Sequence, residues 1–247
     1  MRTKTIRCAY LVWPPLATKD PVTGQLGGVY YDLLERIGKD WNVKIDWVEE
    51  VGAGNRFEGF KTGRYDMLCL PTGATPERTA VSDFSLPFYF CPFYMVTKEG
   101  DTRFDTNRKK ANDPAISMLT IEGYMVKSII EAEFPKAKIQ TLPELSTDSD
   151  VLMSVQMGKA DATVAESVLL ADYMANNPGK LHRVSGPPVR FSGGTIPFPL
   201  NEPQLRAKLN TTLQYYLDTG VIEKILMKHN IGPDKVLRVA DPYKHLP

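Results

Sequence analysis

One arginine of the chain lies in a setting that suits the binding of an anion. Arg78 closes the run Thr75-Pro76-Glu77-Arg78, and a guanidinium presents a rigid fork that matches a carboxylate through two parallel hydrogen bonds. The side chain of Thr75 is placed to cap a helix whose first backbone N–H groups would point at an anion. An isolated arginine would be interpreted as a surface residue near a helix start. The residues alone therefore leave a carboxylate-binding role for Arg78 as one of two interpretations.

The cysteines do not indicate a metal site. Cys8, Cys69 and Cys91 fit neither a zinc-ligand spacing nor a dense disulfide framework, so buried free thiols are the favoured interpretation. Cys8 and Cys69 both lie in strand-like runs, and whether they can meet depends on a sheet order that spacing does not supply. We expect no cofactor and no metal ion, and the redox compartment stays open.

Length and composition indicate a globular protein without a polyanionic partner. The chain has 247 residues, 43% of them hydrophobic and 24% charged, which suits two lobes or one large domain. The chain has thirty basic and twenty-nine acidic residues, so its net charge is close to zero. It therefore lacks the strong positive potential that would attract nucleic acid. No stretch is long and apolar enough to cross a bilayer, and the start, MRTKTIRCAY, lacks the apolar core of an export signal. Export therefore stays an inference.

The first part of the chain alternates strands and helices. A buried strand in residues 5–13 leads to a helix over 30–41 that places Leu33, Leu34, Ile37 and Trp41 on one face. A second strand at 43–51, a short helix from Asn55 to Gly63 and a third strand at 65–71 follow. This rhythm predicts an open parallel α/β sheet, which binds ligands beyond the carboxyl ends of its strands.

A second α/β series begins after the polar stretch 101–114. It has strands at 115–119, 138–142 and 161–165 and helices over 124–134 and 149–158. The glycine- and proline-rich segment 185–199 is expected to be a loop that returns the chain to the first lobe. The last fifty residues are expected to be helical, with a break at Gly220.

Five ordered motifs resemble the type 2 periplasmic solute-binding proteins, in the amino-acid-binding family (family 3 extracellular solute-binding proteins) shared with glutamate-receptor ligand cores. The resemblance spans nearly the whole chain and is most specific in the third of these motifs: GGVYYDLLERIG, FEGFKTGRYDM, ATPERTAVSDFSLPFY, GKADATVAES and LNTTLQYYLDTGVIEKI. It implies an α/β fold of two Rossmann-like lobes joined by a two-strand hinge. Lobe 1 would hold residues 1–96 with 194–247, and lobe 2 residues 97–193.

The resemblance also assigns roles to individual residues. Arg78 would grip the α-carboxylate of the ligand, and Glu166 would accept its amino group across the closed cleft through a charge-assisted hydrogen bond. Thr75 and Gly73 would support the carboxylate, although Gly73 stands where relatives have a hydroxyl residue. Without the resemblance, Glu166 would be interpreted as a solvated glutamate that opens a helix.

Aromatic residues after the first strand would form a wall of the pocket. Trp13 and Tyr10 align with wall positions, where a ring can cover the ligand and a hydroxyl can contact its side chain. As isolated aromatics they would more often belong to a core. Ala53 stands where many relatives place a second stacking aromatic, which weakens any transfer of ligand identity.

Glu122 is the most consequential departure from the family pattern. It aligns where relatives place a small hydroxyl residue that donates to the ligand carboxylate, and a carboxylate there would repel that group. Either Glu122 points into solvent, or the ligand carries a further cation that Glu122 and Glu166 hold together. We include Glu122 and its neighbour Gly123 among the ligand-binding residues, with a zwitterionic or cationic amine-bearing ligand as the hypothesis.

The function implied is a periplasmic or other extracytoplasmic protein that binds an amino acid or related amine and delivers it to the membrane permease of an ABC transporter. We expect a monomer that is not an enzyme. Two alternatives stay open: a dehydratase resembling cyclohexadienyl dehydratase, and the sensor domain of a membrane receptor. Against the first, none of the imidazoles lies in a recognised catalytic motif or in the pocket motifs: His182, His229 and His245.

Overall fold

The computed structural model describes residues 4–52 and 54–239, so Ala53 and His245 lie outside the described residues. The chain divides into two compact units: unit 1 comprises Met1–Phe90 with Ser192–Pro247, and unit 2 comprises Cys91–Phe191. Both boundaries fall inside strands, which are β7 (Tyr89–Lys98) and β12 (Arg190–Gly194). Among the described residues, no helix has the length and apolar character that crossing a membrane requires.

Unit 1 is built on a parallel sheet with the strand order β4-β1-β5. Its strands are β1 (Thr5–Tyr10), β2 (Thr18–Lys19), β3 (Leu26–Gly27), β4 (Lys44–Glu50), β5 (Met67–Leu68), β6 (Asp83–Phe84) and β13 (Pro197–Phe198). Its helices are α1 (Val29–Trp41), α2 (Glu58–Lys61), α3 (Pro76–Thr79), α7 (Pro203–Asp218) and α8 (Val221–Lys228). The last two come from the far end of the chain, so unit 1 is discontinuous in sequence.

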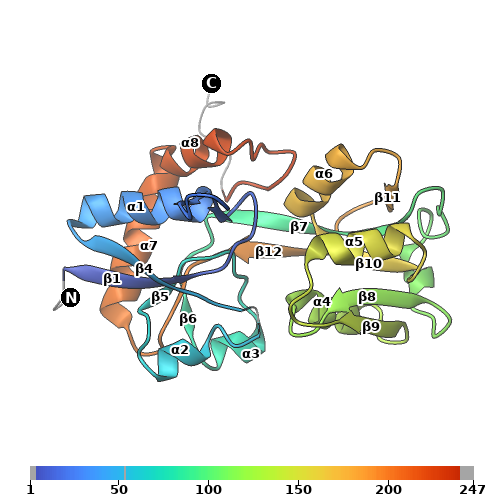
Figure 1. Ribbon diagram of the computed structural model, residues 1–247, viewed down its shortest axis with the longest axis horizontal. Coiled ribbons are helices and arrows are strands. Elements are labelled where there is room, and N and C mark those ends of the chain that lie inside the picture. Colours follow the sequence, from blue (N-terminus) through green and yellow to red (C-terminus); the bar gives the residue numbers. More distant parts are fainter. Residues whose placement is uncertain (1–3, 53, 240–247) are drawn as a thin grey trace. The chain divides into compact units, whose positions relative to one another are not determined.

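Helix α1 packs against β4 and α8 (Figure 1), and it does so through the apolar face that its spacing predicts. Leu33, Leu34 and Ile37 are fully buried. Trp41, at the end of the same face, donates from Nε1 to Oγ1 of Thr212 on α7 at 2.9 Å. The predicted apolar face of this helix is therefore confirmed, and it holds the C-terminal helices to the sheet.

A disulfide joins Cys8 to Cys69, which corrects the expectation of free thiols at these two positions. The Cα atoms are 5.5 Å apart, and both residues are completely buried. Cys8 lies on β1 and Cys69 directly follows β5, and these two strands are neighbours in the sheet. The sheet order therefore supplies the proximity that the sequence spacing could not. Cys91 is free and buried, as expected.

An acidic residue of α1 anchors the last helix. Oδ2 of Asp32 lies 2.7 Å from Nζ of Lys228 and 2.6 Å from Nε2 of His229. Burial alone would raise the pKa of Asp32, but hydrogen bonds from Lys228 and His229 outweigh it and hold that pKa below its usual value. The charged carboxylate therefore stabilises the packing of α8 on α1.

We expect Asp32→Asn to lower the free energy of unfolding at pH 7 by roughly 1 kcal/mol. A depressed carboxyl pKa contributes stability above the pKa of the unfolded state, about 3.9, and loses it as the pH falls through the folded value. The difference between wild type and variant should therefore shrink below about pH 4. Urea unfolding at several pH values measures it, with Asp46→Asn, an exposed partner of Lys44, as the control. A pH-independent difference would contradict this account.

Two predicted elements of unit 1 are wrong in detail. The short helix α2 begins at Glu58 with Phe57 as N-cap, and no side chain caps it, whereas Asn55 was the predicted start. Asn55 instead closes a preceding turn, because its carbonyl accepts from the N–H of Glu58. The segment 185–199 is not only a loop, since it contains β12 and β13, which pair with β7 and β6. Gly194 on β12 is required there, because a Cβ would lie 2.2 Å from the ring of Tyr89.

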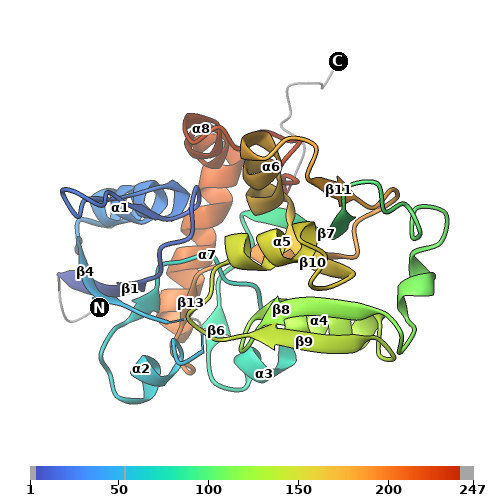
Figure 2. The same cartoon turned by 45° about the vertical axis from the view of Figure 1, so that its right-hand side comes forward.

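Unit 2 is a mixed sheet of order β11-β7-β10-β8-β9, with β12 also paired to β7. Its remaining strands are β8 (Ser117–Ile121), β9 (Lys138–Leu142), β10 (Ala162–Glu166) and β11 (Leu181–Arg183). Its helices are η1 (Arg108–Ala111), α4 (Met125–Glu133), α5 (Asp148–Gln156) and α6 (Ser167–Asn176). Strands β8 and β9 run side by side in parallel (Figure 2). Helix α5 starts with a capping box formed by Thr147 and Asp150.

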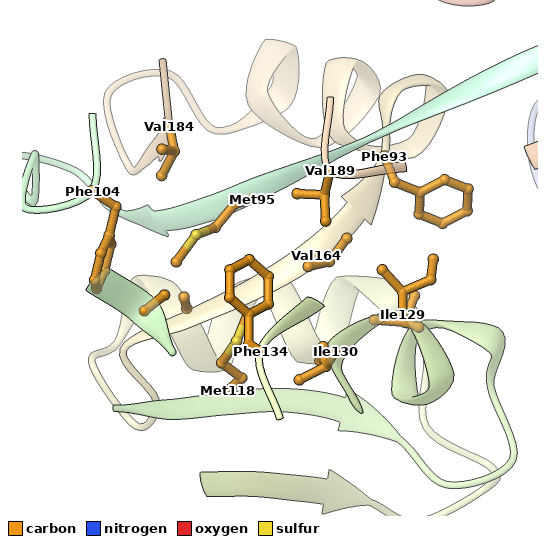
Figure 3. Packing of buried hydrophobic residues seen from close by; sticks show 13 residues of the cluster. Phe93, Met95, Phe104, Met118, Ile129, Ile130, Phe134, Val164, Val184 and Val189 are labelled. Carbon is orange, nitrogen blue, oxygen red and sulfur yellow. The ribbon is translucent and has the colours of Figure 1, made fainter. Parts of the chain in front are cut away.

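The core of unit 2 mixes aromatic, methionine and β-branched side chains. Figure 3 shows the rings of Phe93, Phe104 and Phe134 in one cluster with Met95 and Met118. Flexible methionines fill the irregular gaps that rigid rings leave. This core fixes β8, β10 and α4, whose ends carry the predicted site residues of this unit.

Candidate functional site

The predicted site residues of unit 1 follow the carboxyl ends of neighbouring parallel strands. Tyr10 ends β1, and the segment 71–78 follows β5. The carbonyl of Thr72 accepts from both N (3.2 Å) and Oγ1 (2.6 Å) of Thr195, which fixes the start of this segment. Parallel α/β sheets present their ligand-binding loops at this edge.

The structure brings Gly73, Thr75 and Arg78 together. Nη1 of Arg78 donates to the carbonyl of Gly73 at 2.9 Å, and its guanidinium lies over the ring of Phe57 at 5.9 Å. Thr75 is the N-cap of α3, and its Oγ1 accepts from the backbone N–H of Arg78 at 3.4 Å. The predicted cap is thus confirmed. The half-buried guanidinium is oriented by a carbonyl on one side and a ring on the other.

Tyr10 and Trp13 occupy the chain just after β1. The ring of Tyr10 packs edge-on against Trp47, and Nζ of Lys19 donates to its hydroxyl at 3.4 Å while pairing with Glu50 at 2.7 Å. Trp13 forms a backbone bridge with Ala17 that closes a tight turn. Both side chains are partly exposed. Their proposed role in the pocket wall stays a prediction.

In unit 2, Glu166 lies at the carboxyl end of β10, where it is the N-cap of α6 without a side-chain capping bond. The next residue, Ser167, has its Oγ 3.4 Å from Sγ of Cys91. Burial raises the pKa of the Cys91 thiol to about 12, and the nearby charge of Glu166 adds to the effect. The carboxylate of Glu166 therefore lies close enough to β7 to affect the pKa of Cys91. Cys91 stays protonated and unreactive.

Glu122 and Gly123 form the turn between β8 and α4. Glu122 is 54% exposed, and its Oε1 lies 2.9 Å from Nζ of Lys127, whose hydrogen bond and charge hold the pKa of Glu122 below its usual value. Gly123 has a φ of 78°, a left-handed conformation that favours glycine. Lys127 is thus the cation that Glu122 contacts in this structure. The contact of Glu122 with a ligand stays a prediction.

Sequence reasoning missed two groups near these residues. Phe57 lies beneath Arg78, which only the packing of the turn before α2 reveals. Asp148 at the start of α5 lines a cavity with Thr120 and Tyr124. The Thr147–Asp150 capping box in the sequence could have marked the start of this helix, but not the strands that it faces.

Comparison with solved structures identifies the fold of the chain. The ancestral amino-acid-binding protein that is a precursor of cyclohexadienyl dehydratase has a similar structure, with a TM-score of 0.77 at 23% identity, covering 91% of this chain and 94% of that one. An amino acid ABC transporter substrate-binding protein of Streptococcus pneumoniae bound to L-arginine has a TM-score of 0.77 at 16% identity, covering 92% and 94%. The fold is the type 2 periplasmic binding protein fold, which confirms the predicted fold class.

The sequence itself gives the family. Residues 6–232 match the bacterial extracellular solute-binding proteins, family 3. The L-arginine-binding protein of Pseudomonas aeruginosa is 26% identical over 227 residues, covering 88% of this chain and 84% of that protein. The chain belongs to the family 3 extracellular solute-binding proteins, and the resemblance of its five motifs is confirmed.

Proposed function

We propose that this protein captures an amino acid, or a related solute with a carboxylate and a protonated amine, and delivers it to the membrane permease of an ABC transporter. The observation that carries this proposal is the fixed guanidinium of Arg78, held by Gly73 and Phe57 at the ligand-binding edge of unit 1. A donor fork that is already oriented loses little entropy when it binds a carboxylate. The L-arginine-binding protein of Pseudomonas aeruginosa, to which this chain is 26% identical, supports an amino acid as the solute.

The second half of the proposed site is Glu166 of unit 2. We propose that one solute contacts Arg78 through its carboxylate and Glu166 through its amine, so that both contacts form only in a closed state. The solute would then shift the population toward that state by its differential affinity. X-ray scattering supports closure if the radius of gyration falls on saturation, and an unchanged radius with a tightly bound solute contradicts it.

We propose an extracytoplasmic location and a monomeric protein. The buried Cys8–Cys69 bond supports the location, because stable disulfides form and persist in oxidising compartments. Family membership points the same way.

The experiment that tests the function is titration calorimetry of protein freed of retained ligand by unfolding and refolding, against the standard amino acids and simple amines. Binding of at least one amino acid is expected. Glu166→Gln should weaken it by roughly tenfold, because an amide replaces a charge-assisted acceptor. The control is Glu99→Gln, an exposed glutamate in the turn after β7, which should change affinity less than twofold. No binding across the panel would contradict the proposal.

We propose reversible binding rather than catalysis. Within the described residues, His182 contacts Asp105 and His229 contacts Asp32, so both imidazoles belong to structural pairs. Incubation with prephenate or arogenate should therefore leave either compound unchanged. Turnover that Glu166→Gln abolishes would instead establish a dehydratase.

A further inference from the structure

A small cavity opens in unit 2 where two parallel strands separate. Strands β8 and β10 pair at one register position, Met118 with Ala162. Beyond it, Oγ1 of Thr163 donates to the carbonyl of Leu119 at 2.7 Å and replaces a ladder bond. The cavity lies at the carboxyl ends of these strands and measures about 10 Å³; its polar lining residues are Thr120, Tyr124, Asp148 and Thr163.

The topology places this cavity where open α/β sheets bind ligands. The chain passes from β8 through α4 to β9 on one side, and then through α5 to β10 on the other side of β8. The connections therefore diverge between β8 and β10. A crevice at the carboxyl ends of strands, at such a switch point, is the usual ligand position in this kind of sheet.

One polar group of the cavity lacks a hydrogen-bond partner among the described residues, and a second lacks a cationic partner there. Thr120 is 1% exposed, and its Oγ1 has no hydrogen-bond partner among the described residues. The carboxylate of Asp148 accepts a hydrogen bond from its own backbone N–H but forms no ion pair in the described part of the chain, and burial raises its pKa to about 6. It is mostly ionised at neutral pH. A carboxylate without a cationic partner and a buried unpaired hydroxyl both cost stability, which a bound cationic donor would relieve.

We propose that this cavity binds a primary ammonium group at the end of the solute's side chain. The inference rests on the proposed function, in which Glu166 accepts the α-amine. The volume admits about one water-sized group, which an –NH₃⁺ matches and a planar guanidinium or imidazole exceeds. An ammonium donates three hydrogen bonds, and the cavity offers acceptors in Asp148 and Thr120. The preferred solutes are therefore diamino acids such as lysine and ornithine.

The test compares L-lysine and L-ornithine with L-norleucine, which has the lysine side chain without its amine, and with L-arginine. By calorimetry, wild type should bind lysine at least about tenfold more tightly than norleucine. Asp148→Asn should weaken lysine binding by roughly tenfold and norleucine binding by less than about twofold. Thr120→Val should weaken lysine binding by about threefold. Glu131→Gln, an exposed glutamate of α4, is the matched acid-to-amide control and should change neither.

The outcomes separate the two proposals. If the wild type binds amino acids but holds norleucine as tightly as lysine, or arginine more tightly than lysine, the cavity proposal fails and the proposed function stands. The cavity proposal also fails if Asp148→Asn weakens the binding of lysine and of norleucine by the same factor. If no amino acid binds, both fail. Circular dichroism checks the fold of each variant, and the lysine–norleucine comparison in wild type decides even if Asp148→Asn does not fold.

Discussion

Arg78→Ala is expected to weaken amino-acid binding by roughly 100-fold, the largest effect on affinity of any substitution considered. The guanidinium is oriented by the carbonyl of Gly73 and the ring of Phe57 before any solute arrives. Removing one member of a desolvated charge pair costs about 2–5 kcal/mol, because the other charge is left without a partner. Here that charge is the carboxylate of the solute.

Calorimetry of three variants would separate the geometry of Arg78 from its charge. Arg78→Lys keeps the charge but loses the fork and the stacked plane, so we expect a loss of about tenfold. The control is Arg64→Ala, which removes an exposed arginine paired with Glu49 at 2.6 Å and should leave affinity within twofold. If Arg78→Ala and Arg64→Ala bind the solute equally well, Arg78 does not contact it.

Loss of the Cys8–Cys69 bond is expected to have the largest effect on stability. The two cysteines are 61 residues apart in sequence, and in the chain-entropy model closing a loop of that length stabilises the folded state by roughly 4 kcal/mol. The bond also links two neighbouring parts of the unit 1 sheet, because Cys8 lies on β1 and Cys69 directly follows β5. We therefore expect wild-type protein treated with a strong reductant to unfold at much lower denaturant concentration than oxidised protein.

A double variant isolates the bond from the packing of its atoms. Cys8→Ala with Cys69→Ala should be destabilised under all conditions, and its unfolding midpoint should not respond to reductant. Cys91 is buried and free, so it offers no second bond to reduce within the described residues. A wild-type midpoint that is the same with and without reductant would show that the bond contributes little.

Local signals in the sequence predicted the elements of unit 1 more reliably than their contacts. The apolar face of α1 and the break at Gly220, which has a φ of 72°, depend on residues a few positions apart, and both are confirmed. The Cys8–Cys69 pairing depends on which strands are neighbours, a long-range property that spacing does not encode. The start of α2 was wrong because a turn closed by a backbone carbonyl competes with side-chain capping at Asn55.

The same division holds for the site. Thr75 and Arg78 lie within one helical turn, so the cap and the direction of the backbone donors followed from the motif. The pairing of Glu122 with Lys127 crosses the turn into α4, and Asp148 and Thr120 line one cavity only because two separate elements, α5 and β8, meet. Such contacts arise from tertiary packing, which local sequence patterns do not determine.

The discontinuity of unit 1 has a consequence for how a newly made chain folds. During synthesis unit 2 is complete as soon as its last residue emerges, because its residues are contiguous. Unit 1 cannot complete the packing of α1 until α7 and α8 have been made, because Trp41 pairs with Thr212, and Asp32 pairs with Lys228 and His229. The part of the chain that is made first is thus the last to complete its native packing.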